Sequence, residues 1–123
     1  MLELVEIIRG AMLVVSNESS PVHIAAATAT PSVCLVGGGH FGRFMPYTIE
    51  GQEDSPFSSP VAVWHEMDCF GCSWKCKFEL ENQQTVPCVS MISITHVAKI
   101  CQTTLIESLN TVNDTGSHSI GYQ

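Results

Sequence analysis

The sequence predicts an α/β domain in which short apolar strands alternate with helices. The chain has 123 residues, of which 45% are hydrophobic and only 14% charged, a composition typical of about one globular domain. Over residues 2–36, helical and strand-like patterns alternate with short connections, which indicates a doubly wound layout with a parallel sheet. A sheet of that kind usually holds about five strands. Because only three are expected here, we predict a partial Rossmann-like domain.

The first helix is predicted over residues 2–10. Its apolar residues fall at the spacing that places them on one helical face, namely Leu4, Ile7, Ile8 and Ala11. Residues 12–15 (Met-Leu-Val-Val) are short, apolar and partly β-branched. We therefore expect them to form a strand buried on both faces, as parallel strands are.

A second helix and a second strand follow directly. Ser20 is the expected N-cap, Pro21 suits the first helical position, and the helix should end before Pro31. Residues 33–36 (Val-Cys-Leu-Val) then predict another buried strand. The small side chains of the helix allow close approach to the sheet.

The second half of the chain is less regular. Residues 37–60 are rich in glycine and proline, so we expect a long loop, followed by a third strand at residues 61–64. A cysteine-rich loop is expected over residues 65–88, and Val97, Ile100, Cys101, Thr104 and Leu105 predict one face of a helix over about residues 95–109. We place the domain at residues 1–109 and a polar, disordered tail at residues 110–123.

Composition excludes several classes of function. The net charge is −7, and only five residues are lysine or arginine, so no nucleic-acid partner is expected. No apolar run reaches the roughly 18 residues of a membrane span, and the first residues lack the basic region of a signal peptide. We therefore expect a cytoplasmic protein.

The turn at residues 17–23 (Asn-Glu-Ser-Ser-Pro-Val-His) is the first candidate site. A helix start presents unpaired N–H groups and a partial positive charge, and both attract phosphate. Ser19 and Ser20 add hydroxyl donors, and His23 lies one turn into the helix. The plainer alternative is that Ser20 is only a cap and His23 only a partly exposed helix residue.

The second candidate is the run Gly37-Gly38-Gly39-His40-Phe41-Gly42, which satisfies the spacing G-x-G-x-x-G after a strand. A dinucleotide fingerprint must open a helix, and Pro46 prevents one here. A glycine-rich loop at the end of a parallel strand is still a typical ligand position, where Arg43 offers a fork to phosphate or sugar. A flexible surface loop with a solvated Arg43 is the alternative.

The third candidate is the set of cysteines at 69, 72, 76 and 88. Four thiolates can bind zinc tetrahedrally, although only one close C-x-x-C pair is present. Redox activity is the weaker interpretation, because a thioredoxin-like strand and helix are lacking. We favour a structural role, in which Cys69, Cys72, Cys76 and Cys88 close an irregular loop through a metal ion or disulfides.

The remaining ionisable residues favour ordinary roles. The acidic residues Glu50, Glu53 and Asp54 are expected on a solvated face. His40, His65 and His96 are expected to be polar surface residues. The thiols of Cys34 and Cys101 stand among apolar residues and are expected in the core.

Several ordered motifs together resemble glycosyltransferase family 9, the ADP-heptose:lipopolysaccharide heptosyltransferase family. The run VVSNESSPVHIAAATATPSVCLVGGG is similar to that family's donor-binding signature, in which a strand leads into Asp-Ser/Thr-Gly-Pro-x-His on a helix. The run GGGHFGRFMPY (residues 37–47) and the later C-x-x-C-x-x-x-C block resemble the same C-terminal region, so the likeness covers about residues 1–107. It implies the C-terminal, donor-binding half of a GT-B enzyme.

The resemblance also implies roles for individual residues. Ser19 and nearby backbone N–H groups would contact the donor diphosphate, Pro21 would start the helix, and His23 would lie beside the ligand. Glu18 stands where the family usually has Asp, and Ser20 where it usually has Gly. The complete set of expected donor-binding residues is Glu18, Ser19, Ser20, Pro21, His23, Gly37, Gly38 and Arg43.

The implied function is transfer of a sugar from an ADP-heptose-like nucleotide-diphosphate sugar to a lipopolysaccharide-type, other glycan or lipid-linked acceptor. The general base belongs to the family's N-terminal domain, so no catalytic residue is expected in this chain, which should be inactive alone. No cofactor is required for catalysis, and zinc would be structural. Such an enzyme would work in the cytoplasm, with peripheral association at the inner membrane face. The alternatives are a non-catalytic nucleotide-binding module and a metal-stapled structural or interaction protein.

Overall fold

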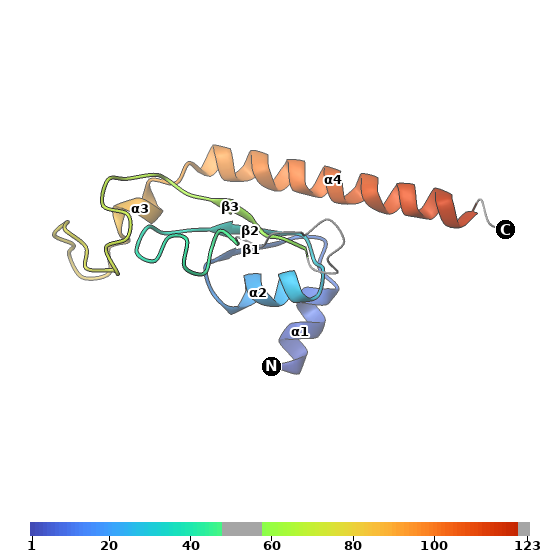
Figure 1. Cartoon of the computed structure of the whole chain (residues 1–123), viewed down its shortest axis with the longest axis horizontal. Coiled ribbons are helices and arrows are strands. Elements are labelled where there is room, and N and C mark those ends of the chain that lie inside the picture. The colour runs from blue at the N-terminus through green and yellow to red at the C-terminus, as the bar shows by residue number, and fades with distance from the viewer. Residues whose placement is uncertain (48–57, 121–123) are drawn as a thin grey trace.

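The computed structural model describes residues 1–47 and 58–120. A small parallel sheet lies between two helices, with α2 against one face and α4 across the other (Figure 1). In chain order the elements are α1 (Leu2–Arg9), β1 (Val14–Asn17), α2 (Ser20–Ala27), β2 (Ser32–Leu35), β3 (Val61–Val63), α3 (Pro87–Ser90) and α4 (Ile94–Ile120). The predicted α/β class is confirmed.

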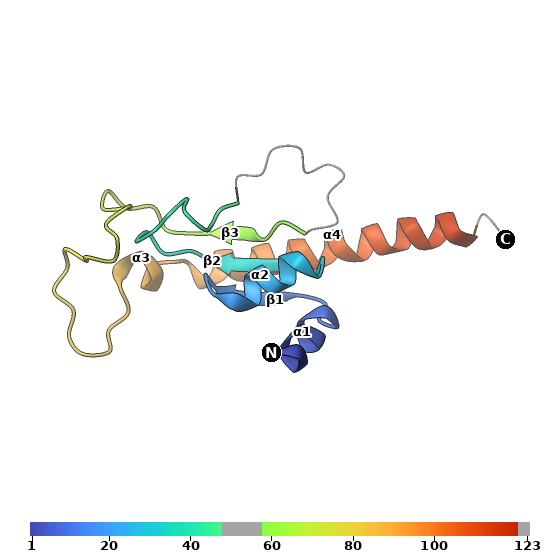
Figure 2. The same ribbon diagram turned by 60° about the horizontal axis from the view of Figure 1, so that its bottom comes forward.

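The three strands pair in the order β1-β2-β3, all parallel. Val14 pairs with Ser32, and Val33 pairs with Val61, so the three carboxyl ends lie at one edge of the sheet (Figure 2). The predicted burial of the first strand on both faces is wrong. β1 starts at Val14, and Val15 is 49% exposed, because α4 packs over β2 and β3.

The core lies on the α2 face of the sheet. Val22, Cys34, Val36 and Met45 are completely buried, and Phe41, Tyr47 and Ala62 pack against them. Met45 comes from the loop after β2, so this loop closes the core instead of standing away from it. The expectation that Cys34 is a small core residue is confirmed.

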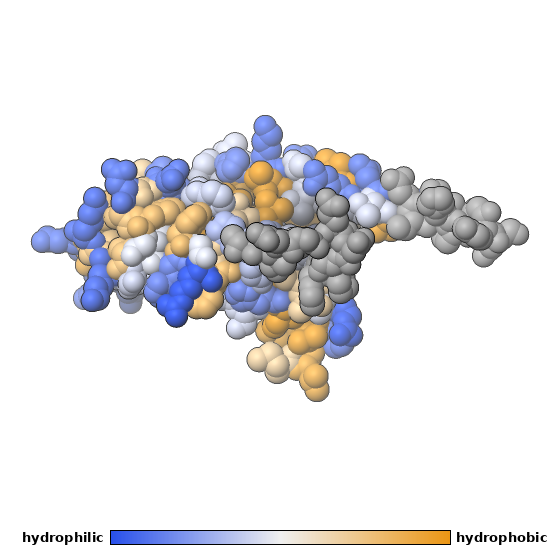
Figure 3. Space-filling model, viewed as in Figure 1, coloured by the Kyte–Doolittle hydropathy of each residue, from blue (hydrophilic) through white to orange (hydrophobic). Residues whose placement is uncertain are grey.

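Helix α1 contributes little to this core. The predicted helix is present, but most of its apolar face is not buried, since only Ile8 is buried and Leu4 and Ile7 are 38% and 65% exposed. The helix is anchored at its carboxyl end, where the Thr30 hydroxyl donates to the Ile8 carbonyl at 3.1 Å. Its remaining apolar side chains form exposed surface (Figure 3).

Helix α4 packs on the sheet through the predicted face. Val97, Ile100, Cys101, Thr104 and Leu105 are all half-buried, but no side chain between residues 94 and 113 is fully buried. The helix continues to Ile120, where the sequence predicts a polar tail. Polar composition does not stop a helix that is already nucleated, because each added residue then needs only propagation.

The segment between β3 and α4 is mostly irregular. Residues 64–86 form turns, and the short helix α3 follows without having been predicted. The acidic residues Glu50, Glu53 and Asp54 lie outside the described residues. Within the described ranges, no helix combines the length and apolar character needed to cross a membrane.

Candidate functional site

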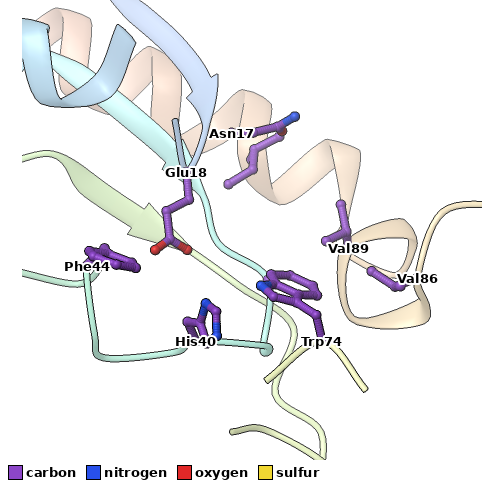
Figure 4. A pocket seen from close by; sticks show the side chains of 9 residues that line it. Asn17, Glu18, His40, Phe44, Trp74, Val86 and Val89 are labelled. Atoms are coloured by element: carbon purple, nitrogen blue, oxygen red, sulfur yellow. The ribbon is translucent and has the colours of Figure 1, made fainter. Parts of the chain in front are cut away.

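A cavity of about 340 Å³ opens where β1 and β2 end (Figure 4). Open α/β sheets place their ligands at this edge, beyond the carboxyl ends of the strands. The lining comes from the β1–α2 turn, the loop after β2, the cysteine-rich segment and α3. The lining residues are Asn17, Glu18, Leu35, Gly37, His40, Phe44, Trp74, Val86 and Val89.

Glu18 contributes the cavity's carboxylate. Its side chain points between Phe44 and His40 (Figure 4), and the oxygen Oε1 is buried without a hydrogen-bond partner. Burial raises the pKa of Glu18 above its ordinary value of 4.5, and the positive charges of His23 and His40 act in the opposite direction. An unpaired buried oxygen destabilises the folded chain, and such groups gather at ligand sites.

The start of α2 differs in detail from the prediction. Ser19, not Ser20, is the N-cap, because Ser19 has extended backbone and Ser20 is already helical. The Ser19 hydroxyl lies 3.3 Å from both Ser16 Oγ and the Asn17 carbonyl. The Val22 N–H donates to the Ser19 carbonyl at 3.3 Å, and Pro21 has no N–H. Ser20 is therefore the exposed hydroxyl donor best placed to meet an anion here.

His23 lies outside the cavity lining. Its Nδ1 is 2.5 Å from the Tyr47 hydroxyl, and the two rings stack with centroids 5.8 Å apart. Burial raises the pKa of Tyr47, so the tyrosine keeps its proton at neutral pH. This pairing leaves Nε2 as the ring nitrogen that could meet a ligand at the helix start.

The glycine triplet is buried beneath aromatic rings and is not a flexible surface loop. We call these three residues the glycine floor. Gly37, Gly38 and Gly39 are buried, and a Cβ on any of them would come within 2.2–2.4 Å of an aromatic ring, that of Trp74 or Phe70. The Gly71 N–H donates to the Gly38 carbonyl at 2.8 Å, which ties the triplet to the cysteine-rich segment. Their φ angles are not positive, so the backbone conformation does not itself require glycine here. Glycine is required because a Cβ would clash with the rings.

The dinucleotide interpretation of this loop stays rejected, because residues 40–46 form turns and bends and do not open a helix. Arg43 is exposed and outside the cavity lining. Its guanidinium carbon lies 5.1 Å from the centroid of the Phe44 ring, and Phe44 is itself part of the cavity wall. Arg43 is therefore a rim residue.

Sequence reasoning missed several residues of the cavity lining, among them His40 and Trp74. His40 was expected on the polar surface, but it lines the cavity and meets the edges of Phe44 and Trp74 at centroid distances of 6.3 Å. Its place just after a strand and three glycines was a usable signal. Trp74 had no such signal, because its segment lacks periodicity and reaches the cavity only through tertiary packing.

The four predicted zinc ligands gather but do not form a ligand set. Cys69, Cys72, Cys76 and Cys88 all line one small apolar cavity, and all are free thiols. Across residues 1–47 and 58–120, no three His, Cys, Asp or Glu side chains are arranged to hold a metal ion. Cys88 instead accepts a hydrogen bond from the Gly38 N–H at 3.4 Å, so this thiol contacts the glycine floor.

A parallel sheet with a cavity at its carboxyl edge, beside a helix start, is the arrangement in which open α/β sheets place their ligands. Residues 1–53 match the model of glycosyltransferase family 9 (heptosyltransferase). The resemblance is thereby confirmed over this segment. No curated protein and no solved structure matches it. The likeness of the later cysteine block stays a prediction.

Proposed function

We propose that this chain binds a nucleotide-diphosphate sugar as the donor half of a GT-B glycosyltransferase. The observation that carries the proposal is a cavity whose residues Asn17, Glu18, Gly37 and His40 lie inside the segment matched by the family model. The start of α2 lies directly beside this cavity, since Ser19 and Ser20 follow Glu18.

The diphosphate would bind at the start of α2. The positive end of the helix dipole favours an anion there, and the exposed Ser20 can add a hydroxyl donor. Arg43 on the rim and Nε2 of His23 are the nearby cationic or donor groups. Donors fixed before the reaction stabilise the leaving diphosphate as its charge develops, which is this chain's share of the chemistry.

The acceptor side lies elsewhere. Sugar transfer needs a general base for the acceptor hydroxyl, and we assign that role to no residue of this chain. The donor is ADP-heptose-like and the acceptor a lipopolysaccharide-type, other glycan or lipid-linked acceptor, reached in the cytoplasm at the inner membrane face. The isolated 123 residues should therefore bind a donor without transferring sugar, and measurable transfer would contradict this.

The test replaces Ser20 by Asp. A carboxylate at this position suits the helix dipole and should leave the melting temperature unchanged or slightly higher, but it should repel a bound diphosphate. We expect affinity for ADP- or UDP-sugars to fall about tenfold or more, as measured by isothermal titration calorimetry. Inorganic diphosphate serves as a second ligand that lacks the base and sugar.

Ser93→Asp is the matched control. Ser93 caps α4, where its hydroxyl accepts the His96 N–H at 3.2 Å, so this variant adds the same charge at a different helix start. Its nucleotide-sugar affinity should equal that of the unchanged chain. Equal losses in both variants, or no nucleotide-sugar binding by the unchanged chain, would overturn the proposal.

A further inference from the structure

Trp74 is held in a strained position at the cavity wall. Ser73 and Trp74 both have left-handed backbone, with φ of 54° and 62°, although a bulky residue rarely adopts this region. Backbone of this kind is destabilising and persists only where its surroundings enforce it. The side chain nevertheless stays 45% exposed and lines the cavity. The strained backbone therefore holds an aromatic ring at the cavity wall and not in the core.

The glycine floor makes this position possible. A Cβ on Gly39 would lie 2.2 Å from two atoms of the indole and 2.7 Å from a third, so the glycine lies against the face of the ring. The Ser73 N–H donates to the Gly39 carbonyl at 2.9 Å and fixes the turn before the tryptophan. One side of the indole is thus covered by backbone, and the side chain lines this cavity (Figure 4) as well as the small apolar cavity of the cysteines.

The rest of the lining indicates what this surface meets. Leu35, Phe44, Val86 and Val89 are apolar, whereas Glu18 brings a carboxylate with an unpaired buried oxygen. A carboxylate at this place repels a diphosphate, so the cavity suits the neutral part of a donor. A group with a flat apolar face and hydrogen-bond donors for Glu18 fits this lining, and a pyranose ring with its hydroxyl groups has both.

We propose that the donor's sugar occupies this cavity, with its apolar C–H face stacked on the indole of Trp74 and a hydroxyl donating to Glu18. The proposal rests on the function proposed above and deepens it, because it separates a sugar subsite from the diphosphate site at the start of α2. Trp74 then determines how much the sugar adds to affinity. ADP and UDP lack the transferred sugar and do not use this subsite.

The experiment compares four chains by calorimetry: the unchanged chain, Trp74→Ala, Trp74→Phe and Trp64→Phe. Trp64 is 40% exposed, packs on Phe41 and lies outside the cavity lining, so its variant is the matched control. Each chain is titrated with ADP and UDP and with their sugar conjugates. Trp74→Ala should weaken conjugate binding about tenfold and leave ADP and UDP binding unchanged, while Trp74→Phe should lose less.

Fluorescence supplies a readout independent of affinity. The chain contains two tryptophans, so Trp64→Phe leaves Trp74 as the only one. Methyl pyranosides and nucleotide sugars should change its emission, whereas ADP and UDP should not. Thermal unfolding identifies any variant that has lost its fold. If Trp74→Ala does not fold, Trp74→Phe still tests the subsite, because it keeps an aromatic ring against the glycine floor.

The outcomes separate the two proposals. If Trp74→Ala weakens ADP, UDP and their conjugates equally, or weakens none of them, the sugar subsite is wrong while the donor-binding function stands. If no nucleotide form binds the unchanged chain, the donor-binding function is wrong. The methyl pyranosides then decide alone: a change in Trp74 emission supports the subsite, and no change overturns it.

Discussion

The two helices that cover the sheet are packed against it very differently. Against α2, the side chains of Val22, Cys34 and Met45 are completely inaccessible to solvent. Against α4, none of residues 94–113 is fully buried, and Ile94 is 86% exposed. Dense packing restricts motion, because side chains that interdigitate have little free space. The turn that carries Glu18 and the loop that carries Gly37 both belong to the α2 face, so the cavity is built on the rigid side.

The largest effect that tests this difference is expected from Met45→Ala. Met45 is fully buried in the α2-face core, so truncation should reduce the free energy of unfolding by about 2–5 kcal/mol. The matched change on the other face is Leu105→Ala, where a half-buried side chain should contribute about 1 kcal/mol. Urea denaturation of both variants measures the two values, and similar losses would remove the contrast between the faces.

A smaller effect is expected from Gly39→Ala. The new methyl group would lie 2.2 Å from the Trp74 ring, and overpacking of this kind costs about 1–3 kcal/mol. Trp74 emission should shift, because the indole must move away from the floor. Gly10→Ala is the control, since its nearest atom would be 3.5 Å away and its φ is −85°. That change should stabilise the chain by about 0.4–1 kcal/mol, so destabilisation by both variants would argue against a specific floor.

The smallest effect is expected from Glu18→Gln, and it depends on pH. Because burial raises the pKa of Glu18, the folded chain binds this proton more tightly than the unfolded chain does. The resulting stability is present below pH 4.5 and is lost as the pH rises through the raised pKa. Glu18→Gln should therefore increase the free energy of unfolding at pH 7 by on the order of 1 kcal/mol, with the gain fading towards pH 4.

Thermal unfolding from pH 4 to pH 8 measures this dependence on pH. Glu107→Gln removes the same charge from an exposed position on α4 and should change the free energy of unfolding by less than about 0.5 kcal/mol. A gain for Glu18→Gln that is constant across this range would show that burial of its charge is not the cause.

Local signals account for what the sequence predicts well. The apolar runs at residues 33–36 and 61–64 and the serine-proline start of α2 depend on neighbouring residues, and all three elements are present. The same dependence on neighbouring residues explains why only part of the site could be predicted from the sequence. Glu18 and Gly37 follow strands directly, whereas Trp74 joins them because the turn at residues 71–73 hydrogen-bonds to the glycine carbonyls. No periodicity in the sequence records that contact.

Burial on the α2 face also gives the chain an internal reporter. Burial, with a smaller contribution from the charge of Glu18, raises the pKa of the Cys34 thiol to about 11, so roughly one such thiol in ten thousand is ionised at pH 7. The other five cysteines are all partly accessible. An alkylating reagent should therefore label them first and reach Cys34 only when the domain opens. The labelling rate of the Cys34 sulfur then measures how often the folded domain opens locally.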